Sequence, residues 1–182
     1  MTDAKKLLEQ VLILRAQSGD DAAFVRLVDR YHPRLLYYVK RLLGGGADAE
    51  DVMQGVWLDA YNQLYRLKAP EAFSVWLYRI ARNKAVQNIR SERTYAPIED
   101  ANEVAAPEEE EPTWSPEDAA LVTQALDALS HDHREALTLR FMEEMSYDEI
   151  AEITGCSIGT VRSRLHYAKR QVRKFVEENR HE

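Results

Sequence analysis

The stretch from Thr94 to Asp118 constrains the fold of this 182-residue chain more than any other, because it divides the chain in two. It carries nine acidic residues, four of them consecutive at Glu108–Glu111, together with four prolines and no lysine or arginine. Such a composition, without helical periodicity, is typical of a flexible linker. The two flanking regions are therefore predicted to form separate small domains, and 45% hydrophobic residues suffice to give each a core.

The same segment accounts for the acidity of the protein, whose formal net charge is -7 at pH 7. The chain has 31 acidic and 24 basic residues, so removing the nine acidic residues of the linker leaves 22, and a net charge of +2. Outside the linker the chain is thus mildly basic overall, which is compatible with binding nucleic acid.

Both flanking regions show the three- and four-residue apolar spacing of helices with one buried face, and neither shows strand-like alternation. In the first region Pro33 favours a bend or break, the glycines from Gly44 end a helix, and Asp48 caps the next one. We therefore predict an all-α fold of two small helical domains. The expected core positions of the first domain are Phe24, Leu27, Val28, Tyr31, Leu35, Leu36, Val39, Leu42, Leu43, Val52, Val56, Trp57, Ala60, Tyr61, Leu64, Phe73, Trp76, Leu77, Ile80, Ala81, Val86 and Ile89.

The last helix predicted in the first region, FSVWLYRIARNKAVQNIRSER (73–93), places basic residues beside its apolar stripe. Lysine and arginine neutralise phosphates, aromatic rings stack on unpaired bases and asparagine can read a base edge, so the mixture suits single-stranded or distorted DNA. A core helix with an ordinary solvated basic face is the alternative that stays open. The candidate DNA contacts are Trp76, Arg79, Arg82, Asn83 and Lys84.

The second region contains the more specific pattern, SYDEIAEITGCSIGTVRSRLHYAKR (146–170). A short helix from Tyr147 is followed by Gly155, which suits the positive φ of a tight turn, and by Ser157, which suits the cap of a second helix. Ala151 is small where the helices cross, and Val161 closes the core. This spacing predicts a helix-turn-helix. The preceding core positions are expected to be Leu121, Ala125, Leu126, Leu129, Ala136, Leu137, Leu139 and Phe141.

The second helix of this motif is the recognition helix, whose N-terminal end enters the major groove of DNA. From Ser157 to Val176 the chain has six lysines and arginines and no acidic residue, as expected of a helix lying along phosphates. Arg162 and Arg164 are candidates for base or phosphate contact, and the sequence does not divide these roles. A helical hairpin with a solvated basic tail is the weaker alternative. The candidate contacts are Ser157, Thr160, Arg162, Ser163, Arg164, Lys169 and Arg170.

The sequence does not indicate an enzyme, a metal site or a cofactor. Cys156 is the only cysteine, and it can form neither an internal disulfide nor a metal site by itself. His131, Asp132 and His133 could form part of a metal site, but they are not joined by a further ligand at helical spacing, as in an HExxH motif. We therefore interpret them as the start of a helix capped by Ser130 or Asp132. No phosphate-binding glycine loop, signal peptide or run of ~20 apolar residues is found, so a cytoplasmic protein without membrane insertion is expected.

Three segments, in this order, resemble the bacterial RNA polymerase sigma factors of the extracytoplasmic-function (ECF) type. They are AEDVMQGVWLDAY (49–61), FSVWLYRIARNKA (73–85) and the helix-turn-helix segment (146–170), and the resemblance covers Gly19 to Val176. It implies a non-enzymatic factor that binds core RNA polymerase and directs promoter-specific initiation. The implied domains are an N-terminal extension (1–18), sigma region 2 (19–93), the acidic linker (94–118) and sigma region 4 (119–182).

The resemblance also implies a role for each segment. AEDVMQGVW resembles the part that docks on the clamp helices of the polymerase β′ subunit, which implies contacts from Asp51, Gln54 and Trp57, although Gly55 stands where the family commonly has glutamate. WLYRIARNKA resembles the part that opens promoter DNA and captures a flipped base of the −10 element, with the loop around Lys68 to Ala72 shaping the pocket. The recognition helix resembles the one that binds the −35 element.

The partners implied by the resemblance are promoter DNA, the β′ clamp helices and β flap of core RNA polymerase, and an anti-sigma factor. Three interpretations of the acidic linker stay open: a mimic of RNA phosphates in a polymerase channel, a solvated spacer, or an inhibitor of DNA binding by the free protein. The alternative function is a stand-alone helix-turn-helix regulator of duplex DNA. The WLYRIARNKA helix argues against it, and a pull-down of core polymerase would distinguish the two.

Overall fold

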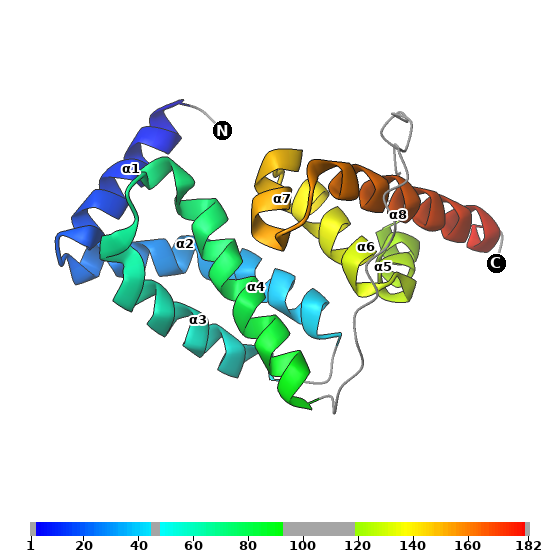
Figure 1. Ribbon diagram of the computed structural model, residues 1–182, viewed down its shortest axis with the longest axis horizontal. Coiled ribbons are helices and arrows are strands. Elements are labelled where there is room, and N and C mark those ends of the chain that lie inside the picture. Colours follow the sequence, from blue (N-terminus) through cyan, green and yellow to red (C-terminus); the bar gives the residue numbers. More distant parts are fainter. Residues whose placement is uncertain (1–2, 45–47, 93–118, 181–182) are drawn as a thin grey trace. The chain divides into compact units, whose positions relative to one another are not determined.

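The computed structural model describes residues 3–44, 48–92 and 119–180, and every regular element within them is helical (Figure 1). The chain divides into two compact units, 1–94 and 95–182. The predicted all-α fold of two helical domains is confirmed, whereas the segment predicted as an acidic linker lies outside the described residues. None of the described helices combines the length and the apolar character needed to cross a bilayer.

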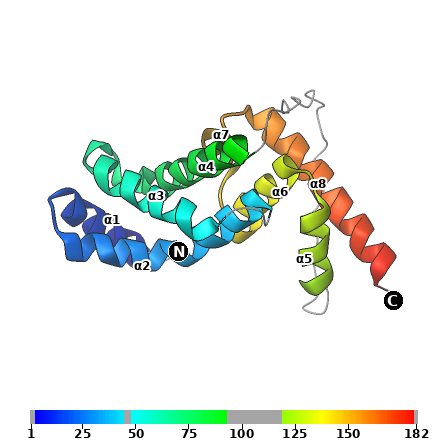
Figure 2. The same ribbon diagram turned by 90° about the horizontal axis from the view of Figure 1, so that it is seen from below.

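The described part of the first unit consists of four α-helices, with two short 3-10 turns before the last. These elements are α1 (Asp3–Gln17), α2 (Asp21–Leu43), α3 (Ala49–Gln63), η1 (Leu64–Arg66), η2 (Pro70–Ala72) and α4 (Phe73–Glu92). Figure 2 shows α1 beside α2 and α3 beside α4, and α2 also contacts both α3 and α4. α2 thus contacts each of the other three helices and holds the unit together.

The ends of α2 are set by local chemistry. The Asp20 carboxylate accepts a hydrogen bond from the backbone N–H of Ala23 (3.1 Å), and Gly44 adopts a left-handed φ of 66° at the C-terminal end. The break that Pro33 favours does not occur, because α2 runs unbroken through it. Pro33 is exposed, so water can reach the carbonyl group that lacks a backbone partner there.

The core of the first unit lies where α2 meets α3 and α4. Two tyrosines that the sequence analysis did not place there, Tyr38 of α2 and Tyr78 of α4, are fully buried with ring centroids 5.3 Å apart. Burying each large apolar side chain contributes about 1.5–3 kcal/mol. The fully buried positions that the apolar pattern predicted include Leu27, Leu35, Val39, Val56, Ala60, Leu77 and Ala81.

α1 packs on α2 through one apolar and one acidic side chain. Ile13 is 1% exposed, and the largely buried Glu9 accepts a hydrogen bond from the hydroxyl group of Tyr31 in α2. Burial, together with the Glu9 carboxylate, raises the pKa of Tyr31, so this hydroxyl stays protonated and continues to donate. The helix that falls within the expected N-terminal extension is therefore anchored to the first unit, while Leu7 and Leu8 remain exposed on its other side.

The described part of the second unit contains α5 (Ala119–Ala128), α6 (His131–Leu137), a π-helical turn η4 (Thr138–Met142), α7 (Tyr147–Thr154) and α8 (Ile158–Asn179). α5, α6 and α7 all contact α8, the long helix at the C-terminal end (Figure 1). The core contains most of the predicted positions, but Phe141 is 40% exposed rather than buried. Phe141 lies in the π-helical turn, whose wider spacing rotates this side chain away from the face that a regular helix would bury.

Arg134 of α6 fixes the end of α5. Its guanidinium group donates hydrogen bonds to the backbone carbonyl oxygens of Leu126 (2.9 Å), Asp127 (2.8 Å) and Leu129 (3.0 Å). Two of these oxygens belong to the last turn of α5 and the third to the residue just after it, and the positive charge also complements the helix dipole. One side chain therefore holds the α5–α6 turn against which α8 packs.

Candidate nucleic-acid interface

The outer face of α3 combines polar and apolar side chains. Asp51 and Gln54, two of the implied polymerase contacts, are exposed, and Leu58 and Tyr61 follow on the same helix with 62% and 53% of their surface exposed. Tyr61 was expected in the core, but it lies outside, and its hydroxyl donates a hydrogen bond to Asp21 (3.0 Å). The implied polymerase contacts Asp51 and Gln54 thus share this face with two exposed side chains that could bury apolar surface against a partner.

Trp57, the third implied polymerase contact, is half-buried and held in a fixed orientation. Its indole Nε1 donates a hydrogen bond to Nδ1 of His32 (3.1 Å), and the edge of its ring contacts Phe24, with ring centroids 6.1 Å apart. Nε2 of His32 lies 3.6 Å from the Glu50 carboxylate. A His32 that accepts at Nδ1 must carry its proton on Nε2, the nitrogen that faces Glu50.

The candidate DNA contacts of α4 differ in accessibility. Arg79 and Asn83 are exposed, whereas Trp76, Arg82 and Lys84 are half-buried. The ammonium group of Lys84 pairs with the Asp59 carboxylate of α3 at 2.9 Å. Its stem passes over Gly55, where an added Cβ would lie 3.7 Å from Lys84 Cδ and Cε. An added Cβ at Gly55 would therefore make only ordinary van der Waals contact with the lysine that links the two helices.

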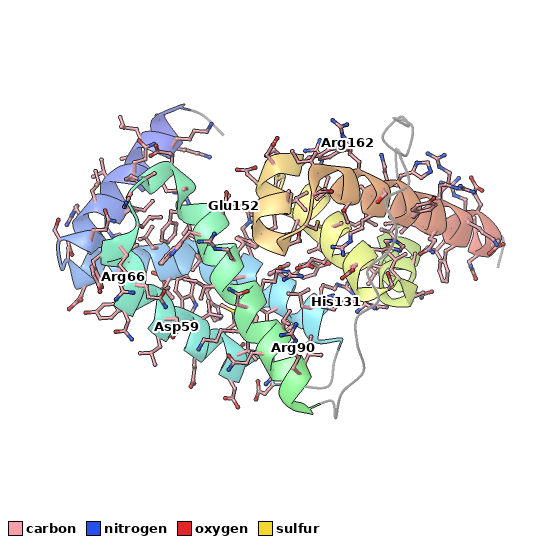
Figure 3. The ribbon with its side chains drawn as sticks, viewed as in Figure 1. Asp59, Arg66, Arg90, His131, Glu152 and Arg162 are labelled. Carbon is pink, nitrogen blue, oxygen red and sulfur yellow. The ribbon has the colours of Figure 1, made fainter. Side chains whose placement is uncertain are left out.

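The loop between α3 and α4 exposes two groups that the sequence analysis did not single out. Tyr65 is 64% exposed, and the Arg66 guanidinium lies over its ring, 5.3 Å from the centroid, with Nε donating to the Tyr65 hydroxyl (2.8 Å). Figure 3 labels Arg66 at the outer edge of the unit. A tyrosine followed by an arginine just before a predicted loop was the available signal, because stacking and charge together suit unpaired nucleotides.

The helix-turn-helix forms as predicted, and local hydrogen bonds define both of its helices. Ser146 and Glu149 form a reciprocal capping box at the start of α7, and Gly155 takes a φ of 71° at its end. The Ser157 hydroxyl then accepts a hydrogen bond from the backbone N–H of Thr160 (3.0 Å), which caps α8. The start of the recognition helix is therefore pre-organised before any DNA binds.

The predicted contacts on α8 divide into accessible and inaccessible side chains. Arg162 and Arg170 are exposed, and Figure 3 shows Arg162 projecting away from the side of α8 that carries α6. Ser163 and Lys169 are buried, at 7% and 8% exposure, and the Ser163 hydroxyl donates to the Thr160 carbonyl (3.0 Å). DNA contact by Ser163 and Lys169 stays a prediction. It requires that the two side chains first become accessible to the DNA.

Arg164 is held inside the second unit. Its Nη2 lies 2.5 Å from the Asp132 carboxylate at the start of α6, its Nη1 lies 3.8 Å from Cys156 Sγ, and its side chain is only 11% exposed. A charged pair with so little solvent around it is difficult to separate, because removing one partner leaves the other buried and uncompensated. The sequence left Arg162 and Arg164 equivalent, whereas the structure separates them: Arg162 is accessible and Arg164 has an intramolecular partner.

The histidines at the start of α6 surround the same carboxylate. His131 Nδ1 lies 3.5 Å from Asp132, and burial lowers the pKa of His133, with Arg164 acting in the same direction and Asp132 opposing. Ligand atoms of His131, Asp132 and Glu135 lie within 4.8 Å of one another, but Glu135 is only 1% exposed. The charge of Asp132 is already compensated by Arg164. Ser130, one of the two predicted caps, occupies the N-cap position, but its side chain makes no capping hydrogen bond there.

Comparison with known proteins assigns both units. Residues 27–95 match the sigma-70 region 2 family, and residues 119–172 match the sigma-70 region 4 family. The ECF RNA polymerase sigma-E factor of Escherichia coli K12 is 34% identical over 186 residues, which cover 96% of this chain and 97% of that protein. The corresponding factor of Haemophilus influenzae is 33% identical over 188 residues, covering 96% and 98%.

Two solved structures share the fold. CnrH, in complex with the cytosolic domain of CnrY, superimposes with a TM-score of 0.66 at 24% identity, covering 94% of this chain and 98% of that one. The sigma factor RpoE from Bartonella quintana, in complex with the anti-sigma factor NepR, gives a TM-score of 0.64 at 24% identity, covering 86% and 98%.

Fold and sequence together define a transcription initiation factor of the sigma-70 class, in which a helical region 2 precedes a helix-turn-helix region 4. The chain belongs to the ECF family of RNA polymerase sigma factors. It directs promoter recognition by RNA polymerase, and it does so as a non-enzymatic factor.

Proposed function

We propose that the two units bind the two elements of one promoter, the second unit the −35 element and the first unit the −10 element. The observation that carries this proposal is the pre-organised start of α8, where Ser157 and Gly155 fix the turn and Arg162 remains exposed. An exposed arginine near the N-terminal end of a recognition helix can bridge guanine O6 and N7 in the major groove. Arg170, two turns further along, suits a phosphate contact.

Contact of the first unit with the opened −10 element is supported by the chemistry of α4 and of the loop before it. Arg79 and Asn83 are exposed on α4, and Tyr65 and Arg66 are exposed at the start of the loop. Cations neutralise the strand backbone, and aromatic rings replace the stacking that a base loses when it leaves the duplex. Trp76, Arg82 and Lys84 are further candidates for contact with the opened strand.

The outer face of α3 is our candidate for docking on core polymerase. Its exposed Asp51, Gln54, Leu58 and Tyr61 would lie against the β′ clamp helices, beside a Trp57 whose orientation is fixed by His32. The second unit would contact the β flap. A mixed polar and apolar face of this kind binds a partner without the large exposed apolar patch that promotes aggregation.

An anti-sigma factor is a further proposed partner. Two proteins of the same fold, CnrH and RpoE of Bartonella quintana, were solved in complex with the cytosolic domain of CnrY and with the anti-sigma factor NepR, respectively. We expect this chain to be held inactive by such a protein and to act in the cytoplasm, where core polymerase is found.

Transcription in vitro with core polymerase on a library that randomises both promoter elements tests the proposal. The wild-type protein is expected to select one −35 and one −10 sequence, Arg162→Ala to lose the −35 preference, and Trp57→Ala to bind core polymerase less tightly. Arg26→Ala, at an exposed position of α2, is the control for surface charge. Binding to duplex DNA with full affinity and no initiation would instead indicate a stand-alone regulator.

A further inference from the structure

The loop between α3 and α4 is held from outside by α1. The side-chain amide of Gln17, at the last position of α1, donates one hydrogen bond to the Leu64 carbonyl oxygen (3.0 Å) and one to the Leu67 carbonyl oxygen (2.7 Å). The same Leu64 oxygen also accepts the backbone N–H of Leu67 (3.1 Å), which closes η1. A single amide thus bridges both ends of the turn from which the rest of the loop departs.

This bridge matters because the loop has few hydrogen bonds of its own. η1 and η2 are each three residues long, and neither has a side-chain cap among the described residues. Short 3-10 turns have weak hydrogen-bond geometry, so an isolated loop of this kind would sample several conformations. Both N–H donors of the Gln17 amide are used, at separations of 47 and 50 residues along the chain.

A second line of contacts connects α1 to the start of α4. Glu9 of α1 accepts a hydrogen bond from Tyr31, the ring of Tyr31 packs edge-on against Phe73 with centroids 5.3 Å apart, and the Phe73 ring lies 5.7 Å from that of Trp76. α1 therefore supports both ends of the loop, through Gln17 at its beginning and through Tyr31 at its end. α1 also contacts η1 and η2 directly.

We propose that Gln17 is a positioning residue for base selection at the −10 element. It holds the loop so that Tyr65, Arg66 and the exposed Lys68 present one arrangement to the opened strand. This inference rests on the proposed function of the loop. Gln17 lies outside residues 27–95, the stretch that matches the region 2 family, so α1 adds a determinant to a site that the matched region does not contain by itself.

The test compares the wild-type protein with Gln17→Glu and Gln17→Ala in initiation assays with core polymerase, on promoters with a fixed −35 and a randomised −10 element. Gln17→Glu keeps the size of the side chain but replaces the donor by acceptors that face carbonyl oxygens. Gln10→Glu makes the same change seven residues earlier on α1 and is the control. We expect both Gln17 variants to reduce the preference for the best −10 sequence over single mismatches by roughly fivefold, about the effect of one net hydrogen bond.

Two further measurements make the outcome decisive. Amide hydrogen exchange of Leu67 to Phe73 should be faster in the Gln17 variants while that of α2 and α3 is unchanged, which excludes a general loss of folding. A uniform loss of initiation across all −10 sequences, or an unchanged preference despite faster exchange, would overturn the inference.

Tyr65→Ala and Lys68→Ala separate the positioning role of Gln17 from the proposed function of the loop. If these variants change the −10 preference and the Gln17 variants do not, the positioning role fails alone; if none of them does, the role proposed for the loop fails as well.

Discussion

α4 and α8 are both long basic helices with proposed roles on DNA, but they are built in different ways. The start of α8 is fixed by neighbours in the sequence: the Ser146 and Glu149 capping box, Gly155 and the Ser157 cap lie within twelve residues. The start of α4 follows an irregular loop that is held by Gln17, 47 to 50 residues earlier. A helix that reads duplex DNA needs a rigid start in a groove of fixed shape, whereas a site for an unpaired base needs a loop that bends around it.

The two units also differ in how they use their cations. In the second unit Arg164 forms a nearly buried pair with Asp132, and Arg162 is left accessible two residues earlier. In the first unit Lys84 pairs with Asp59 at about one-third exposure of each side chain. A partly exposed pair of that kind contributes little and is easily exchanged for a phosphate, while the Arg164 pair is part of the core. The first unit can therefore redistribute its charges on binding DNA more readily than the second.

The largest effect is expected for Arg162→Ala, which removes the accessible arginine of α8. Affinity for duplex −35 DNA, measured with the polymerase holoenzyme, should fall by about 1–3 kcal/mol, and discrimination at one base pair should be lost. Arg170→Ala, two turns further along, should weaken binding equally on all sequences and should reduce the slope of log affinity against log salt concentration by about one. If both variants behaved alike, α8 would contact only the backbone, and the contrast with α4 would disappear.

The next largest effect is expected for Asp132→Asn, which tests whether Arg164 belongs to the core. We expect the free energy of unfolding of the second unit to fall by about 2 kcal/mol, because an uncompensated guanidinium group stays nearly buried. Urea unfolding followed by amide NMR signals of α6 and α8 measures this separately from the first unit. Glu177→Gln, at an exposed position of α8, is the matched control. An unchanged stability would make Arg164 available to DNA in the same way as Lys84.

Two glycine substitutions should act in opposite directions in the two units. Gly155→Ala places a side chain at a φ of 71° and should destabilise the second unit by about 1 kcal/mol, although no atom lies within 4 Å of the added Cβ. Gly55→Ala should stabilise the first unit by about 0.5–1 kcal/mol, because α3 is regular there and the new Cβ makes ordinary contacts with Lys84. Thermal unfolding of each variant is the measurement. A loss of stability in Gly55→Ala would show that the Lys84 stem needs more room than the structure gives it.

The smallest effect concerns pH and is expected in the second unit. The pKa of His133 is lowered mainly by burial, so the folded state disfavours its protonated form, with Arg164 adding to this effect and Asp132 opposing it. The stability is therefore complete above the ordinary pKa of about 6.5 and decreases as the pH falls below it. His133→Gln should reduce this decrease in the NMR-detected unfolding, and His32→Gln, in the first unit, should not. Equal pH dependence in wild type and His133→Gln would assign the effect to other groups.

The sequence by itself determined the helices, the helix-turn-helix and the separation of the chain into two units. It did so because caps, glycine turns and apolar spacing act over a few residues, and Asp48, Gly155 and Ser157 all form the local structures predicted for them. The resemblance of three segments to ECF sigma factors was equally readable, because each segment is continuous in the chain.

Only the tertiary structure decided which of the candidate side chains are accessible. Arg162 and Arg164 are indistinguishable in a pattern of charges, and Asp132 lies 32 residues from the arginine that it holds. The exposure of Tyr61, the link from Lys84 over Gly55 to Asp59, and the support of the loop by Gln17 depend in the same way on how helices pack. Local propensity does not predict such contacts, because they form between residues that are neighbours only after the chain has folded.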